Sequence, residues 1–379
     1  MQRTISIKLN PTPEQSGKLL ELQQEYATAC NHLVPFALEN RCWNRVALHK
    51  LGYYDTRSAT RLGSQMVCNA IFSVCSSYKT WVSNNPKKPL PAIQFRDTGS
   101  VHFDKRTYTL VDSEISLYTL PGRIKVPFVL GDFQQQYLEQ GTPKEAELIR
   151  KGHNWFFNLV LELEEPASIS PTGKILGVDL GENNLASIST GRIFGGGQLR
   201  HQRDNHLALR QRLQSNGTES SKQLLKKVSG KEARHVKQIN HVVSKQIVEK
   251  ALSSGCDTIA MESLTNIRKR IKAGKRVRSR LHRWAWAQLQ QFVQYKAESA
   301  GLNVVYINPA YTSKTCSECG QLGIRDKHRF SCKNCGTRQH SDLNASRNIC
   351  KVRCSPAFCL IHRRAAFWRS STGNCLKKF

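Results

Sequence analysis

Two short cysteine pairs constrain the fold of this chain more than any other feature of its sequence. Cys316 and Cys319 form one C-x-x-C pair, and Cys332 and Cys335 form a second pair after 12 intervening residues. A glycine follows each pair, which lets the backbone turn so that amides face the sulfurs. This spacing is typical of a structural zinc site with four thiolates on a ribbon. A redox pair and an iron–sulfur site are the alternatives.

The other cysteines favour the same interpretation. The chain has 13 cysteines, an odd number, which suits bound metal in a reducing compartment better than a disulfide framework. No apolar run approaches the ~18–20 residues that span a bilayer, and residues 1–15 lack the apolar core of a signal peptide. We therefore expect a protein of the cytoplasm, or of the nucleus if the cell has one.

The charge of the chain indicates its partner. The 57 Lys and Arg outweigh 28 Asp and Glu, which gives a formal net charge of +29. Such an excess requires a nearby polyanion, for which nucleic acid is the first candidate and a membrane surface or a ribosomal environment are the alternatives. Trp284 and Trp286 can stack on bases, although Trp284 also fits the apolar stripe of a helix. One segment without any acid is predicted to bind phosphates, and its cations are Arg268, Lys269, Arg270, Lys272, Lys275, Arg276, Arg278, Arg280 and Arg283.

The first 90 residues contain a strand signal and helix signals. Apolar residues alternate over 4–9, which predicts a short strand. Thr12 and Gln15 are spaced as a capping box around Pro13, which predicts a helix start. A further helix is predicted over 58–82.

From about residue 90 to 166 the pattern changes to short strands. The segments 116–120 and 156–163 are strand-like and are punctuated by Gly and Pro. They predict a small β-rich unit to which the first strand can return. Residues 166–173 are predicted to be a linker.

The second half alternates strands with helices. Its predicted order is strand, hairpin, helix, strand, helix, strand, helix, which is the order of a ribonuclease-H-like layer. The predicted strands cover 174–180, 185–189, 192–194, 257–261 and 303–307, and the predicted helices cover 231–254 and 281–293.

Three carboxylates lie within or next to these predicted elements. Asp179 lies inside an apolar strand, where an ionised carboxylate needs a cation or a hydrogen-bonding partner; a turn aspartate before Gly181 is the alternative. Glu262 comes at a strand end, where ligand-binding side chains gather in α/β layers, although a lone glutamate there is more often solvated. Asp342 begins a helix and by itself is most simply an N-cap.

Taken together, the three carboxylates predict a nuclease. Magnesium prefers hard oxygen ligands, and two ions about 3.5–4 Å apart hold the attacking water and the leaving oxygen in phosphodiester hydrolysis. Such a pair of ions needs several carboxylates that converge from separate elements. Asp179, Glu262 and Asp342 have that distribution along the chain.

The motifs, in their order, resemble the TnpB family, RNA-guided nucleases of bacterial and archaeal insertion sequences related to the type V CRISPR effectors. The resemblance rests on G-V-D-L-G at 177–181, M-E-S-L at 261–264, the ribbon opened by T-S-K-T-C at 312–316 and D-L-N-A at 342–345. It covers roughly 174–350, whereas the N-terminal half is similar in layout only. His340 stands where many relatives have an aspartate.

The resemblance implies a multidomain α+β fold. A ribonuclease-H-like (RuvC) α/β nuclease domain with an inserted zinc ribbon would follow an N-terminal β-rich wedge domain and a helical recognition insert. The implied bounds are 1–10 and 90–170 for the wedge, 11–89 for the recognition insert, 171–311 and 339–351 for the nuclease domain, 312–338 for the ribbon and 352–379 for a disordered tail.

The resemblance also implies an activity and partners. Asp179, Glu262 and Asp342 would be catalytic ligands of two Mg²⁺ ions, with Mn²⁺ as an alternative, and the four cysteines would hold Zn²⁺. The protein would bind a guide RNA from the transposon end and cut double-stranded target DNA in the prokaryotic cytoplasm, at the nucleoid. A guide-loaded DNA-binding repressor and an RNA-independent, structure-selective nuclease are the alternatives. The presence of all three carboxylates counts against the repressor.

Overall fold

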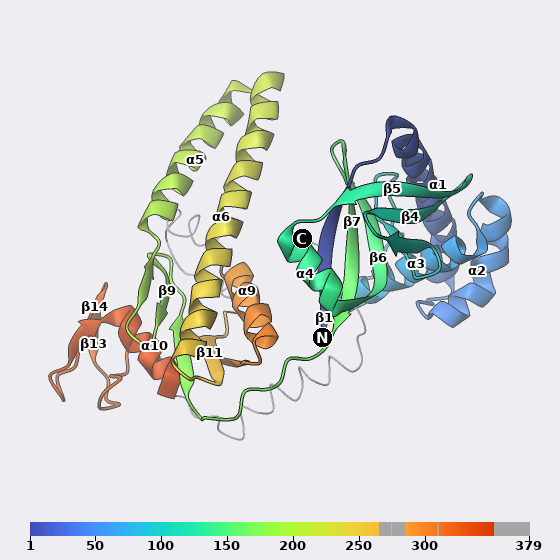
Figure 1. Ribbon diagram of the computed structural model, residues 1–379. Helices are drawn as coiled ribbons and strands as arrows, with labels where there is room; N and C mark the ends of the chain where they lie inside the picture. The colour runs from blue at the N-terminus through green and yellow to red at the C-terminus, as the bar shows by residue number, and fades with distance from the viewer. Residues whose placement is uncertain (265–273, 275–284, 309–310, 352–379) are drawn as a thin grey trace. The chain divides into compact units, whose positions relative to one another are not determined.

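The computed structural model describes residues 1–264, 274, 285–308 and 311–351 (Figure 1). The chain divides into two compact units, of which the first comprises residues 1–164 and the second begins at Glu165. Each unit has its own hydrophobic core and is described by itself. None of the described helices combines the length and the apolar character that crossing a bilayer requires.

The first unit begins as its sequence predicts. Strand β1 (Gln2–Leu9) is followed by helix α1 (Pro13–Glu39). The Thr12 hydroxyl accepts the N–H of Gln15 at 3.2 Å, and the Gln15 side chain accepts the N–H of Thr12 at 3.0 Å. These two bonds confirm the capping box, which satisfies amides that the first helical turn leaves without partners.

The helix predicted over 58–82 is confirmed over most of that range but is interrupted at 60–63. Helix α2 (Arg45–Ala59) ends and helix α3 (Ser64–Asn84) begins within that range. Gly63 lies between them in an extended conformation and donates its N–H to the Tyr118 hydroxyl at 2.8 Å. A tertiary contact therefore takes the amide that a continuous helix would use, and the local sequence does not reveal it.

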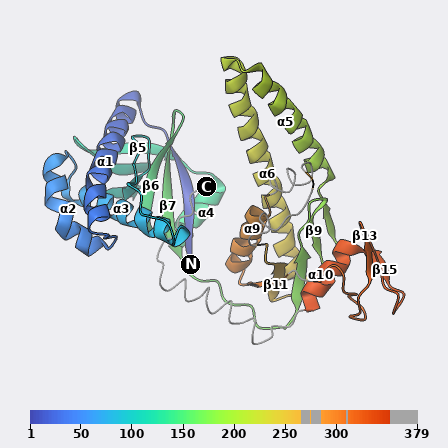
Figure 2. The same ribbon diagram turned by 180° about the vertical axis from the view of Figure 1, so that it is seen from behind.

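The strands of the first unit form one antiparallel sheet in the order β2-β6-β7-β1-β5-β4-β3. Strand β1 lies between β7 and β5, which confirms that the first strand returns to the β-rich part of the chain. Helices α1 to α3 lie along this sheet (Figure 2), and a short helix that the sequence did not predict, α4 (Asp132–Gln140), precedes β6. The other strands are β2 (Val101–Phe103), β3 (Tyr108–Val111), β4 (Glu114–Thr119), β5 (Gly122–Val129), β6 (Gly141–Lys151) and β7 (Asn154–Leu163).

The second unit contains the predicted ribonuclease-H-like layer. Its five-stranded sheet has the order β10-β9-β8-β11-β12. Strand β11 runs parallel to both β8 and β12, whereas β9 runs antiparallel to β8 and to β10. The strands are β8 (Ile175–Asp179), β9 (Asn184–Ile188), β10 (Ile193–Gly195), β11 (Thr258–Glu262) and β12 (Asn303–Ile307).

Helices cover both faces of this sheet. Helices α6 (Glu219–Ser253) and α9 (Trp286–Ser299) contribute Ile247 and Val293 to the main core of the unit. Helix α10 (Ser341–Lys351) packs on the other face, where Ile349 meets Ala260. Helix α5 (Gly197–Asn216) pairs with α6 in a long hairpin (Figure 1). A small three-stranded sheet, β13 (Ile324–Asp326), β14 (Arg329–Ser331) and β15 (Arg338–His340), precedes α10.

Candidate active site and zinc ribbon

Asp179 and Glu262 end two neighbouring parallel strands. Val178 of β8 pairs with Met261 of β11, so the residues that follow them emerge side by side at the carboxyl edge of the sheet. The turn interpretation of Asp179 is wrong, because Asp179 is the last residue of β8 and pairs with Ser187 of β9. Side chains at this edge of a parallel sheet converge on one crevice.

Asp342 reaches the same edge from helix α10. The helix begins at Ser341, so Asp342 is its second residue and the N-cap interpretation is wrong. Its carboxylate accepts a hydrogen bond from the Asn184 side chain of β9 at 2.9 Å, and only 13% of its side-chain surface is exposed. The structure therefore brings together the three carboxylates that the sequence singled out.

Gly177 sets how closely α10 approaches β8. A Cβ atom at this position would lie 2.0 Å from the carbonyl oxygen of Ser346 and 2.6 Å from the amide nitrogen of Cys350. Both are backbone atoms of α10, which cannot rotate away as a side chain can. Only glycine allows the contact that holds Asp342 next to Asp179.

The buried carboxylate of Asp179 is repelled by the charges of the two other carboxylates. Burial and the charges of Glu262 and Asp342 together raise the pKa of Asp179 to about 8, against the opposing charge of Arg325. Burial also raises the pKa of Glu262, although a 2.5 Å hydrogen bond from the Thr312 hydroxyl favours its ionised form. Oxygen ligands that repel one another at a partly enclosed site fit a divalent cation such as Mg²⁺.

The raised pKa of Asp179 predicts a pH-dependent gain of stability in Asp179→Asn. The folded protein holds a proton on Asp179 up to about pH 8, whereas the unfolded chain releases it near pH 4. Stability therefore falls as pH rises through this window, and a neutral amide avoids the loss. Without added magnesium, we expect the variant to be more stable by about 2 kcal/mol at pH 8.5, with little gain at pH 4. Thermal melting at both pH values tests this, and a gain equal at both would contradict it.

Arg325 is a site residue that the sequence analysis missed. It lies on β13 of the small sheet, and its Nη2 is 3.6 Å from Oδ1 of Asp342. Its charge also lowers the pKa of Asp179 and of Glu262. A single arginine between two cysteine pairs belongs to no recognisable motif, so only the fold identifies it.

His340 also adjoins the carboxylates. Its Nδ1 accepts the backbone N–H of Asp342 at 3.2 Å and lies 4.0 Å from Oδ2 of the same residue. The ring stacks on His328 at a centroid distance of 5.5 Å. A histidine at this position thus orients the first turn of α10 through a hydrogen bond.

The four cysteines converge as their spacing predicts. Cys316 Sγ lies 3.6 Å from Cys335 Sγ, Cys319 Sγ lies 3.5 Å from Cys332 Sγ, and all four sulfurs are within 4.8 Å of one another. Two sulfurs bound tetrahedrally to one Zn²⁺ at about 2.3 Å lie about 3.8 Å apart, so the arrangement fits zinc. Within the described residues every cysteine is free of disulfides.

Backbone turns and a hydrogen bond adapt these cysteines to a metal. Gly320 and Gly336 follow the two pairs with φ angles of +77° and +75°, a conformation that glycine adopts without strain. The Thr337 hydroxyl, 3.1 Å from Cys335 Sγ, together with the Thr337 backbone and neighbouring thiols, lowers the pKa of the Cys335 thiol to about 6. The thiolate of Cys335, which is the metal-binding form, is therefore favoured at neutral pH.

Two asparagines join this ribbon to the helix that carries Asp342. Asn344 is fully buried; its side chain donates to Thr315 O at 2.7 Å and accepts the N–H of Ser317 at 2.9 Å. One turn later, Asn348 donates to Thr312 O at 2.8 Å. The first cysteine pair and the carboxylate edge are thus held by one helix, a role that the sequence analysis did not assign to either asparagine.

The predicted nucleic-acid-binding segment is not part of the described structure. Its nine cations, from Arg268 to Arg283, lie outside the described residues, as does Trp284. Trp286 is described, and the prediction that it stacks on bases is wrong. It is 7% exposed and packs in the core of the second unit, because the helical periodicity of α9 turns it inward.

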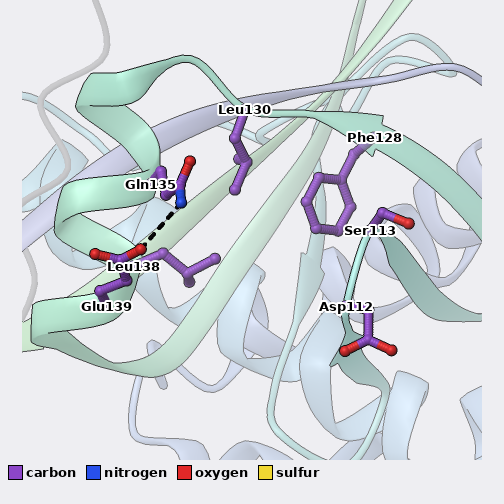
Figure 3. A pocket seen from close by; sticks show the side chains of 7 residues that line it. All are labelled: Asp112, Ser113, Phe128, Leu130, Gln135, Leu138 and Glu139. Carbon is purple, nitrogen blue, oxygen red and sulfur yellow. Dashed lines mark hydrogen bonds between the residues drawn. The ribbon is translucent and has the colours of Figure 1, made fainter.

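The first unit carries two hollows of different chemistry. One of about 360 Å³ is lined by Phe128, Leu130 and Leu138 and by the carboxylates of Asp112 and Glu139 (Figure 3). The other, of about 430 Å³, is lined by cations, carboxylates, amides and a ring, among them Arg45, Lys50, Asp104, Glu145, Gln65, Asn69 and Phe72.

Two sequence families match this chain. Residues 158–268 match the family described as probable transposase, and residues 286–349 match the Cas12f1-like TNB domain. The first range contains Asp179 and Glu262, and the second contains the cysteine ribbon and Asp342.

Several proteins of known sequence are similar to this chain. The TnpB-like protein MJ0751 of Methanocaldococcus jannaschii is 31% identical over 256 residues, which cover 63% of this chain and 90% of that protein. The CRISPR-associated endodeoxyribonuclease Cas12f1 of Sulfoacidibacillus thermotolerans is 31% identical over 231 residues, or 52% of this chain and 50% of that protein. The putative RNA-guided DNA endonuclease InsQ of Escherichia coli K12 is 23% identical over 226 residues, 55% of this chain and 56% of InsQ. The chain thus spans most of MJ0751 and about half of the other two.

Solved structures confirm the fold. The Cas12f1 chain in a cryo-EM complex with single-guide RNA and target DNA superimposes with a TM-score of 0.67 at 15% identity, covering 90% of this chain and 83% of that one. This similarity shows a shared architecture, and the family is shown by MJ0751, of which this chain covers 90% at 31% identity. On these grounds the chain belongs to the TnpB family.

Proposed function

We propose that this protein is an RNA-guided DNA endonuclease. The observation that carries the proposal is the convergence of Asp179, Glu262 and Asp342 at one sheet edge, in a chain of the TnpB family. The protein would carry a guide RNA from the transposon end and cut double-stranded DNA next to a short flanking motif. Guide pairing would read the target sequence, while the protein reads duplex shape and the motif.

The chemistry of the site follows from its residues. Two Mg²⁺ ions, or Mn²⁺ in their place, would supply Lewis-acid stabilisation of the phosphodiester and a reactive water when bound by the three carboxylates. Asn184 orients Asp342, and Thr312 orients Glu262 and favours its ionised form. Arg325 adds a fixed positive charge beside the carboxylates, where it would pair with the phosphate of the bond to be cut.

The domain organisation of the family gives each part of the chain a role. We assign 1–10 and 90–170 to a wedge domain, 11–89 to a recognition insert, 171–311 and 339–351 to the nuclease domain and 312–338 to the zinc ribbon. We expect the protein to act at the nucleoid of a prokaryotic cell, where target DNA and transposon transcripts are both present.

The proposal is tested by the RNA that purifies with the protein. The protein is expressed beside its native flanking DNA, and the nucleic acid that co-purifies is sequenced. One discrete RNA that ends in a variable segment is the expected result. Protein free of RNA that still cuts DNA with magnesium would instead establish an RNA-independent nuclease, and an RNA-loaded protein that binds DNA without cutting it would establish a repressor.

Arg325→Gln should reduce cleavage while leaving the ribbon folded. Glutamine keeps much of the side-chain volume but removes the charge beside Asp342. Loss of one electrostatic contact to a transition state costs on the order of a hundredfold in rate. Single-turnover cleavage at saturating magnesium measures this, with Arg329→Gln on the neighbouring strand β14 as the matched control. Equal rates in the two variants would contradict the assigned role.

Cys316→Ser should lose the bound zinc and destabilise the ribbon. Serine is a poor zinc ligand, and the folding of small metal domains depends on the metal. We expect zinc content to fall from about one ion per chain to well below one, as measured by atomic emission. Cys68→Ser, which replaces a half-buried cysteine of the first unit, serves as the control. Unchanged zinc in Cys316→Ser would refute the four-thiolate site.

A further inference from the structure

The α5–α6 hairpin has a distal half that does not cover the sheet. Helix α6 has 35 residues and is therefore about 52 Å long, whereas a five-residue strand spans about 17 Å. Its C-terminal half packs on the sheet through Val243, Ile247 and Ala251. Its N-terminal half, residues 219–237, extends past the strands beside α5 (Figures 1 and 2). We call this half the arm of α6.

The arm has one face against α5 and one face of cations. Glu232 turns toward α5, where it approaches Arg203 at 3.9 Å and Arg210 at 3.7 Å. At about 100° per residue, five cations fall within a half-circle centred opposite Glu232, and Lys222 lies just outside it. This half-circle is the outer face of the arm. Its cations are Lys226, Lys227, Lys231, Arg234 and Lys237, and all five are exposed.

The outer face is almost free of acids. Glu219 is the one acidic residue of the arm besides Glu232, and it pairs with Lys222 at 3.3 Å. The five cations of the outer face extend over about 17 Å of the helix axis, the length of about five phosphates along one strand of a nucleic-acid duplex. A face that served solubility alone would mix the two signs of charge.

A glycine lies in the middle of this face. Gly230 is the one glycine inside α6, and glycine disfavours a helix relative to alanine. On the helical projection Lys226 and Lys237 lie to one side of it, and Lys227 and Lys231 lie to the other. A Cβ atom there would meet Nη1 of Arg234, the end of a flexible side chain, at 3.3 Å. The two rows of cations thus flank one position without a side chain of its own, beside the Arg234 guanidinium, where a phosphodiester chain can approach the backbone.

We propose that the outer face of the arm binds the phosphate backbone of target DNA and leads it to the carboxylates. The inference rests on the proposed function. DNA is favoured over guide RNA because the hairpin that carries the arm starts at the carboxylate edge: Arg200, in the first turn of α5, donates to the Asn183 side chain at 2.7 Å, and the next residue, Asn184, holds Asp342. A DNA strand that leaves the carboxylates along this hairpin would reach the arm.

The test compares two pairs of lysines on the same helix. Lys227→Gln/Lys231→Gln removes two charges from the outer face, and Lys245→Gln/Lys250→Gln removes two from the half that covers the sheet. Both pairs are placed in Asp179→Ala protein, and binding to a fluorescent DNA duplex of about 30 base pairs is measured by anisotropy from about 0.05 to 0.3 M salt. We expect the first pair to weaken binding about tenfold at about 0.1 M salt and to lower the slope of log K against log salt by about 2. The control pair should change both by much less.

A second variant separates binding from folding. Gly230→Leu keeps every charge and improves helix propensity, so the melting temperature should not fall. The leucine side chain should nevertheless weaken DNA binding several-fold by filling the space beside the Gly230 backbone.

Each other outcome overturns the proposal. Equal salt slopes for the two lysine pairs would show that the arm does not contact DNA phosphates. Loss of co-purifying RNA in the arm variants would assign the face to RNA instead. This assay measures DNA binding alone. The proposed function is tested by other measurements, and it would fail if the protein carried no RNA or cut DNA without Asp179.

Discussion

Asp179→Ala should abolish DNA cleavage and leave guide-RNA binding intact. The substitution removes an oxygen ligand at the end of β8 but no cation that contacts phosphate. Metal ions contribute several kcal/mol to stabilising the transition state, so loss of a ligand should slow cleavage at least about a thousandfold. Cleavage of a matched plasmid target at several magnesium concentrations measures the effect, together with the RNA-to-protein ratio after purification.

An exposed aspartate provides the control for this experiment. Asp97 lies in the first unit, far along the chain from the carboxylates, and Asp97→Ala should cut at the wild-type rate. Cleavage by Asp179→Ala within about tenfold of wild type would remove this residue from the catalytic set. Loss of the RNA in the same variant would show that Asp179 acts in assembly.

Gly177→Ala should have the second-largest effect, without touching any charged group. The added Cβ would lie 2.0 Å from Ser346 O and 2.6 Å from Cys350 N, so α10 must move away from β8. Overpacking of this kind costs about 1–3 kcal/mol or more in stability. Because α10 carries Asp342, we expect loss of cleavage of about a hundredfold or more, since small displacements of catalytic groups are costly.

The control for Gly177→Ala adds the same methyl group at another glycine of the same sheet. Gly195 ends β10, and a Cβ there would meet nothing within 4 Å, so Gly195→Ala is a matched control on the same sheet. Zinc content should stay at the wild-type level in both variants, because the ribbon keeps its four cysteines. Wild-type cleavage and melting in Gly177→Ala would show that the contact between α10 and β8 does not set the position of Asp342.

Local signals predicted the parts of this protein that depend on short stretches of sequence. The capping box at Thr12 and Gln15 and the strand that ends at Asp179 require only neighbours in the chain. The two cysteine pairs could also be interpreted from the sequence alone, because tetrahedral coordination by four thiolates requires this spacing and the glycines that follow. These predictions are confirmed as structure, whereas the catalytic role of the carboxylates stays a prediction.

Contacts between distant residues account for what the sequence analysis missed. The break before α3 depends on Tyr118, which lies 55 residues from Gly63. Trp286 follows a basic segment and was predicted to stack on bases, yet its direction is set by the face of α9 that packs on the core. In each case the deciding partner lies elsewhere in the chain.

The sequence by itself determined the family, the four-thiolate ribbon and the three carboxylates, because each depends on residue types at fixed spacing. Only the tertiary structure decided how these parts meet. Gly177 allows α10 to pack closely on β8, and Asn344 hydrogen-bonds the ribbon to that helix. Arg325, on the ribbon, lies beside the carboxylates. The physical reason is that burial, repulsion and close packing depend on distances in space, and residues separated by more than 150 positions, such as Asn184 and Asp342, come into contact only when the chain has folded.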